Sequence, residues 1–267
     1  MEIKEFKCWE DFEVEIGKIF AFENNLDRER ISSVSSPLFR GQSDSSWKLK
    51  TTLDRVVENF NMSEYHLIMQ SIKSKVESYT DRRWEIGRFK EPERNLWVAP
   101  TLEQYAFMVY LRHNKFPSPL LDWTRSPYIA AFFAFGDAHI GTSVAIFVYI
   151  EDLGQGKTTR GDSPAISTLG PDITTHKRHH LQQSEYSICT KKVNGKMCYW
   201  DHEEVFSKND DEQDLLIKYI LPSSEKTKVL KKLDLMNINA YSLFDTEESL
   251  MQTLTIREFF IERAGEC

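Results

Sequence analysis

An arginine followed by a glycine, Arg40 and Gly41, ends a short apolar segment of β-strand type. A guanidinium next to apolar residues is costly to bury unless it meets an anion, and its planar fork of donors matches phosphate or pyrophosphate oxygens. Gly41 has no side chain, which allows another group to approach the backbone. Arg40 could instead form a structural salt bridge with Asp122 or Asp54. The pair is therefore interpreted either as an anion site or as a tie between elements.

A second polar group occupies residues 122–127, Asp-Trp-Thr-Arg-Ser-Pro. Trp123 offers a flat aromatic surface with one N–H donor, which suits stacking on a planar ring. Thr124 and Ser126 place hydroxyls at the expected start of a helix, where free N–H groups and the helix dipole favour anions. In the structural alternative, Ser126 caps the helix, Trp123 fills the core and Asp122 accepts backbone N–H groups. The segment predicts a ligand site or a helix start.

Gln183 and Glu185 lie two residues apart at the start of a predicted strand, so we expect both side chains on the same face. An amide and a carboxylate placed in this way could orient a ribose hydroxyl and stabilise positive charge on a sugar carbon. The alternative is an ordinary solvated strand face. His113, at the end of a predicted helix, is a further candidate, with a capping or core role as its alternative.

Composition and spacing exclude several other kinds of site. The histidines and cysteines match no zinc pattern, so no metal is expected. The net charge of −7 argues against long-range attraction to nucleic acid or anionic membrane, although a local basic groove would still be compatible with it. The four cysteines form no CxxC pair and fit free thiols in a reducing cytosol. The N-terminus has no signal-type apolar region and no run reaches the roughly 20 residues of a membrane span, so we expect a cytoplasmic protein.

Hydrophobic periodicity predicts the elements that must position these residues. Strand and helix patterns occur in mixed order without a regular βαβ alternation, which favours an α+β fold. We expect one main domain over 1–205 and a mainly helical extension over 206–267, with a long loop at 152–172. Expected helices cover 8–25, 62–88, 101–113, 126–135, 223–235 and 247–263, and expected strands 38–41, 144–150, 186–190 and 215–220.

Two separated segments together resemble the FRG domain, a bacterial family named for its Phe-Arg-Gly motif. The first segment is 37–42, followed by Trp47-Lys48-Leu49 and Asp54-Arg55, and the second runs from Leu111-Arg112-His113 through Pro117 and 120–124 to 126–134. Gln182-Gln183 with Tyr186 is a weaker third match. The resemblance covers about residues 30–200. The family name alone implies no reaction.

The order of these motifs is also similar to that of ADP-ribosyltransferases of the Arg–Ser–Glu class, although the middle segment reads Asp-Trp-Thr-Arg-Ser where that class has Ser-Thr-Ser. This likeness implies a central mixed or antiparallel β core with surrounding helices. It also implies that NAD is the substrate. The residues implied in NAD binding are Arg40, Gly41, Trp123, Thr124, Ser126 and His113, and those implied in catalysis are Arg40, Gln183 and Glu185.

The implied function is an NAD-dependent ADP-ribosyltransferase that acts inside the cell as a toxin or phage-defence effector. Its acceptor would be a protein or a nucleic acid, RNA included. A toxin of this kind would need an antitoxin or chaperone partner, and no membrane partner is expected. The alternative is a non-catalytic module that binds a nucleotide or a partner in the same cleft.

Overall fold

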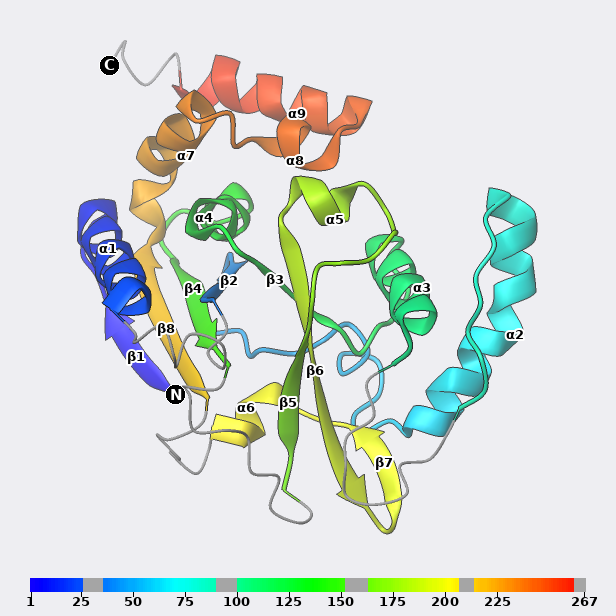
Figure 1. The fold of residues 1–267 in the computed structure, drawn as a ribbon. Coiled ribbons are helices and arrows are strands. Elements are labelled where there is room, and N and C mark those ends of the chain that lie inside the picture. Colours follow the sequence, from blue (N-terminus) through cyan, green and yellow to red (C-terminus); the bar gives the residue numbers. More distant parts are fainter. Residues whose placement is uncertain (26–35, 90–99, 152–162, 207–213, 262–267) are drawn as a thin grey trace.

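The computed structural model describes residues 1–25, 36–89, 100–151, 163–206 and 214–261 (Figure 1). Its centre is an eight-stranded sheet in the order β1-β8-β4-β2-β3-β6-β5, with β7 paired to β6. All neighbours are antiparallel except β1 and β8, so the sheet is mixed. The strands are β1 (Glu2–Glu5), β2 (Leu38–Gln42), β3 (Leu121–Thr124), β4 (Ser143–Ile150), β5 (Ala165–Leu169), β6 (Ser184–Val193), β7 (Lys196–Tyr199) and β8 (Leu215–Pro222).

Helices cover this sheet, which confirms the α+β prediction (Figure 1). Short 3-10 and π-helical turns, Ser223–Glu225 and Arg257–Ile261, flank the C-terminal helices. The helices are α1 (Trp9–Asn25), α2 (Met62–Thr80), α3 (Leu102–His113), α4 (Pro127–Gly136), α5 (Arg178–Leu181), α6 (His202–Val205), α7 (Lys226–Leu235), α8 (Ala240–Phe244) and α9 (Glu247–Ile256).

Three apolar clusters hold the layers together. The largest joins α1, α4 and α7 to the β2, β4 and β8 side of the sheet, with Phe12, Phe39 and Phe135 fully buried. A second packs α2 and α3 against β6. The third lies on the opposite face, under the loop after β2 and under α6. Both faces of the sheet are thus covered, which explains why β4 is apolar along nearly its whole length.

Strands β2 and β3 are paired over only a short stretch. Five registered pairs join β2 to β4, but only one, Phe39 with Thr124, joins β2 to β3. Beyond that pair the two strands separate, and α4 packs directly on β2 beside the opening (Figure 1). Arg40 lies at the point of separation, so the predicted motif and the gap in the ladder coincide.

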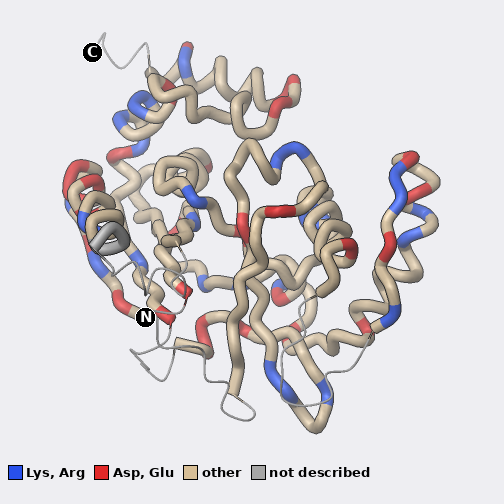
Figure 2. The backbone as a smooth tube through the Cα atoms, viewed as in Figure 1, with Lys and Arg blue, Asp and Glu red and all other residues tan. Residues whose placement is uncertain are grey.

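The N-terminal segment packs against β8 and α7 on one side of the molecule. Strand β1 pairs in parallel with β8, and α1 lies next to α7 (Figure 1). Figure 2 shows acidic residues along α1 and basic residues along α7. Two ion pairs join these helices, Lys228 with Glu10 at 2.7 Å and Lys232 with Glu13 at 2.5 Å.

Several element boundaries differ from the expected ones. Helix α2 ends at Thr80, not at 88, because Asp81 takes a left-handed conformation with φ of 54°. The expected loop at 152–172 contains β5, although residues 152–162 lie outside the described residues. The segment after residue 206 contributes not only helices but also β8, which lies between β1 and β4 in the sheet.

No helix in the described part of the chain is both long and apolar enough to cross a membrane. Three of the four cysteines, Cys8, Cys189 and Cys198, lie in described segments and form no disulfide bond, and Cys267 lies outside them.

Candidate functional site

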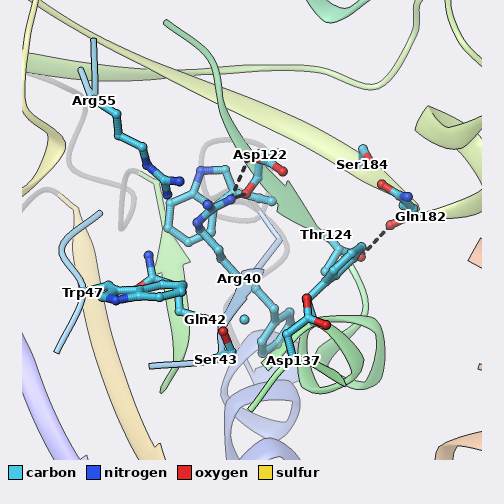
Figure 3. A pocket seen from close by; sticks show the side chains of 14 residues that line it. Arg40, Gln42, Ser43, Trp47, Arg55, Asp122, Thr124, Asp137, Gln182 and Ser184 are labelled. Carbon is cyan, nitrogen blue, oxygen red and sulfur yellow. Dashed lines mark hydrogen bonds and ion pairs between the residues drawn. The ribbon is translucent and has the colours of Figure 1, made fainter. Parts of the chain in front are cut away.

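A cavity of about 200 Å³ opens where β2 and β3 separate (Figure 3). Its walls come from the end of β2, the loop that follows, β3, the end of α4 and the start of β6. Segments far apart in sequence therefore meet at one hollow. The lining residues are Phe39, Arg40, Gly41, Gln42, Ser43, Trp47, Arg55, Asp122, Trp123, Thr124, Phe133, Asp137, Gln182 and Ser184.

Arg40 spans the gap between the strands with its side chain. Its Nη1 donates to the backbone carbonyl oxygen of Asp122 at 2.7 Å and to Oδ1 of the same residue at 2.7 Å. The guanidinium thus replaces a backbone ladder bond that β2 and β3 do not make. Nε is buried and, like Nη2, has no hydrogen-bond partner among the described residues. Arg40 therefore still has donors to offer an anion.

Asp122 is shared by two arginines. Arg112 of α3 donates from Nη2 to Oδ1 at 2.8 Å, on the same oxygen that Arg40 uses. Burial raises the pKa of the Asp122 carboxyl, but the charges of Arg112 and Arg40 outweigh it and hold the pKa well below its usual range. Two cations share one anion, so the cluster keeps a net positive charge. Of the two structural alternatives, the Asp122 salt bridge is present, whereas Asp54 accepts from Thr51.

Gly41 is required by helix packing. A Cβ built on it would lie 1.9 Å from the backbone oxygen of Ala130 and 2.6 Å from the backbone nitrogen of Ala134. Both contacts are to the backbone of α4, which cannot move aside as a flexible side chain could. Glycine thus lets α4 approach the strand that carries Arg40.

Thr124 connects β3 to the start of β6. Its Oγ1 donates to the backbone oxygen of Gln182 at 2.8 Å, and its strand partner is Ser184. Figure 3 shows Thr124, Gln182 and Ser184 together on one side of Arg40. Three of the segments expected to form one site therefore meet: the Arg-Gly strand, the Asp-Trp-Thr strand and the start of the later strand.

Trp123 and Ser126 fill the structural roles given as their alternatives. Trp123 is 4% exposed, its ring stacks on Tyr149 at 5.4 Å between centroids, and its Nε1 donates to Ser187 at 2.7 Å. The ring is therefore committed to the core, although the residue borders the cavity. Ser126 caps α4 by accepting from the backbone N–H of Ile129 at 3.3 Å.

Glu185 and Gln183 do not line this cavity. Glu185 follows Ser184 in β6, so its side chain lies on the other face from Ser184, the face of its strand partner Trp123, and its carboxylate accepts from Nε of Arg125. Gln183 precedes the strand, is exposed, and has a left-handed backbone with φ of 47°. Because of this turn, the expected shared strand face is not formed.

His113 lies at the end of α3, behind the Asp122 cluster and outside the cavity lining. Its Nε2 is 2.8 Å from the hydroxyl of Tyr186, and its ring stacks near that of His176. Burial lowers the pKa of His113 to about 4, so the ring is neutral at physiological pH. The described residues contain no group of three or more side chains that could hold a metal ion.

Sequence reasoning missed the residues that complete the walls. Trp47 and Arg55 lie in the loop after β2, and Asp137 follows α4. Trp47 belongs to the first FRG-like segment, which was the available signal. Arg55 belongs to the same segment, whereas Asp137 carries no local pattern, because only the fold brings it to the opening.

Comparison with known proteins supports part of the resemblance. Residues 35–141 match the family model described as FRG domain. That segment contains Arg40, Gly41 and the shared Asp122, whereas Gln182 and Ser184 lie beyond it. No curated protein and no solved structure matches the chain.

Proposed function

We propose that this FRG-domain protein is an NAD-dependent ADP-ribosyltransferase and that the cavity around Arg40 binds its NAD. The observation that carries the proposal is the guanidinium of Arg40, which keeps unpartnered donors at a cavity also lined by Thr124 and Ser184. Guanidinium forks suit the oxygens of a diphosphate, and the hydroxyls suit a ribose or a carboxamide. A cavity of about 200 Å³ is smaller than the roughly 300–1,000 Å³ of usual ligand pockets, so NAD would extend out of it.

The proposed reaction breaks the bond between the nicotinamide nitrogen and C1′ of the attached ribose. The bonding electrons leave with nicotinamide, which becomes neutral, and the sugar carbon gains positive character. A nucleophile of the acceptor forms the new bond to C1′ and releases its proton. Phosphate binding by Arg40 would hold the dinucleotide in place during this step, and a carboxylate would stabilise the developing positive charge.

For the charge-stabilising carboxylate, the cavity offers a candidate other than Glu185. Asp122 lines the wall but is bound to two arginines, whereas Asp137 lines it as an exposed side chain. We therefore assign the charge-stabilising role to Asp137 or, after release from Arg125, to Glu185. The Arg125 side chain is 52% exposed but that of Glu185 is only 12% exposed, so releasing Glu185 costs more than the about 0–1 kcal/mol of a surface pair, and the positive charge that develops on the ribose would have to replace Arg125 as its partner.

A second function is favoured by the position of Glu185 outside the cavity: nucleotide or partner binding without turnover. The same guanidinium would then bind the phosphate, and no carboxylate would be needed. In either case we propose a role as an intracellular toxin or defence effector. The acceptor of the transferase would be a protein or a nucleic acid such as RNA.

The decisive experiment incubates the purified protein with labelled NAD and cell lysate, and measures both label transfer and nicotinamide release. We expect transfer by the wild type and loss in Arg40→Lys, which keeps the charge but lacks the fork. Replacing the charge-stabilising carboxylate, in Asp137→Asn or Glu185→Gln, should lower kcat by roughly a hundredfold to a thousandfold.

The controls separate the two functions. The exposed Asp172→Asn variant, whose side chain lies outside the cavity lining, should keep wild-type activity. If the protein binds NAD but releases no nicotinamide under conditions where a known transferase is active, the transferase function is rejected and binding without turnover is retained. Activity that survives in Arg40→Lys at the wild-type KM would remove the proposed site.

A further inference from the structure

Trp47 and Arg55, which the sequence did not predict as site residues, form the open side of the cavity. Trp47 is 50% exposed and Arg55 is also exposed, although large aromatic rings usually bury most of their surface. Figure 3 shows both side chains on one side of Arg40, opposite Thr124, Gln182 and Ser184. The cavity thus has two ends with the Arg40 guanidinium between them.

The loop that carries Trp47 is fixed in place. Asp44 accepts from the backbone N–H of Ser46 at 2.8 Å and from its hydroxyl at 2.7 Å, while Trp47 donates from its backbone nitrogen to Asp44 at 3.3 Å. Ser45 donates its N–H to the carbonyl of Ser143 in β4 at 2.7 Å. Because the loop is tied to itself and to the sheet, the exposed ring loses little conformational freedom when it contacts a ligand.

The two side chains complement different parts of a nucleotide. An indole ring offers a flat surface on which a nucleobase stacks. Arg55 makes no ion pair with any described residue, so its guanidinium is available to a phosphate attached to that base. Trp123 cannot provide the flat surface, because its ring is already stacked on Tyr149.

The charges decide which half of a dinucleotide belongs here. The nicotinamide ring of NAD carries a positive charge, which the exposed cation of Arg55 would repel. The uncharged adenine has no such cost. The buried end, with Thr124 and Ser184, is the more sheltered from water, as a reacting centre requires. The non-reacting nucleoside therefore fits the open end.

We infer that Trp47 and Arg55 form an adenosine subsite, in which adenine stacks on Trp47 and its phosphate lies between Arg55 and Arg40. The rest of the dinucleotide then extends toward Thr124, Gln182 and Ser184. The inference depends on the proposed function only for the identity of that second half. An adenine nucleotide alone should occupy the subsite.

The test titrates AMP and ADP-ribose into the full chain and measures affinity by calorimetry and by quenching of tryptophan fluorescence. We expect Trp47→Ala to weaken binding by about tenfold to a hundredfold, and Trp47→Phe to retain most of the affinity. Arg55→Ala should weaken the binding of AMP but not that of adenosine, which has no phosphate. The difference between the wild type and Trp47→Phe isolates the fluorescence change of Trp47.

Matched controls lie elsewhere on the surface. Tyr79 is 92% exposed on α2, and Arg88 is exposed beyond it, so Tyr79→Ala and Arg88→Ala should bind AMP as the wild type does. Thermal melting of each variant verifies folding. Inhibition of ADP-ribose transfer by nicotinamide should be the same in the wild type and in Trp47→Ala.

The outcomes separate this inference from the proposed reaction. AMP affinity that is undetectable in the wild type, or unchanged in Trp47→Ala, overturns the subsite. The subsite is also overturned if Trp47→Ala changes inhibition by nicotinamide but not the affinity for AMP, since the indole ring would then contact the nicotinamide half of NAD. If AMP depends on Trp47 and no ADP-ribose is transferred, the subsite is retained and the transferase fails. If Trp47→Ala transfers ADP-ribose with the wild-type KM for NAD, the transferase is retained and the subsite fails.

Discussion

At the scale of single residues, the candidate site is organised around one carboxylate between two guanidiniums. Asp122 binds Arg40 and Arg112 through the same oxygen. Arg40 is therefore positioned as well as neutralised, and its remaining donors are fixed in direction. The salt-bridge and anion-site interpretations of Arg40 are compatible. Its Nη1 makes the bridge to Asp122, and its Nε and Nη2 have no partner among the described residues.

Replacing Asp122 by Asn should destabilise the fold. The change leaves two cations close together without their anion, and we expect a loss of about 1–3 kcal/mol in the free energy of unfolding. This is below the roughly 3–5 kcal/mol of fully buried pairs, because the Asp122 side chain is 40% exposed and water screens part of the interaction. Urea denaturation measures the loss. The double variant Asp122→Asn with Arg112→Gln should recover part of it, and equal stability of the wild type and Asp122→Asn would contradict the account.

At the scale of elements, the contact between α4 and β2 shapes the cavity. The strand separates from β3 after a single registered pair, and the helix lies on it at Gly41. Any shift of α4 would move Arg40 relative to Thr124, because Thr124 leads directly into the helix. Packing at one glycine thus sets the width of the opening.

Gly41→Ala is therefore expected to lower stability and distort the site. Its Cβ would overlap backbone atoms of Ala130 and Ala134, and overpacking of this kind costs about 1–3 kcal/mol. The melting temperature should fall by several degrees, at roughly 2–4 °C per kcal/mol for a chain of this size. Gly17→Ala is the matched control: no atom lies within 4 Å of its added Cβ, and alanine in a helix should raise stability slightly. Equal melting temperatures for both variants would refute the packing explanation.

Sequence patterns predicted the long elements and the short strand β2, and missed most of the other short elements for a physical reason. Helix α3 begins after the Thr101 cap and α4 after the Ser126 cap, as expected, since caps act locally. Strands β1, β5 and β7 have four or five residues, too few to show a period, and exist because longer neighbours pair with them. In the site, Arg40 and Thr124 were found from their motifs. Trp47 and Arg55 were not, because their position depends on a loop path.

At the scale of the whole molecule, buried histidines link stability to pH. Burial lowers the pKa of His202 to about 3 and that of His113 to about 4. The same cause lowers the pKa of three further histidines. They are His66, His176 and His179.

The expected result is a loss of stability in mild acid. Below about pH 6.5 the unfolded chain takes up protons that the folded chain refuses, so the free energy of unfolding falls as pH falls toward the folded pKa values. Each fully shifted histidine contributes up to about 1.4 kcal/mol per pH unit. Denaturation from pH 8 to pH 5 measures the slope. His202→Gln should reduce it by about one proton while the exposed His139→Gln keeps it, and a flat profile would contradict this linkage.

The pairing of β1 with β8 has a consequence for how the protein is made on the ribosome. Residue Glu2 lies opposite Ile217, which is translated much later, and at roughly 5–20 residues per second the partner strand follows only after about 10–40 s. Throughout that interval the nascent chain presents Trp9, Phe12 and Ile16, which α4 and α7 later cover, without a surface to receive them. This edge of the sheet therefore forms only after β8 has been translated.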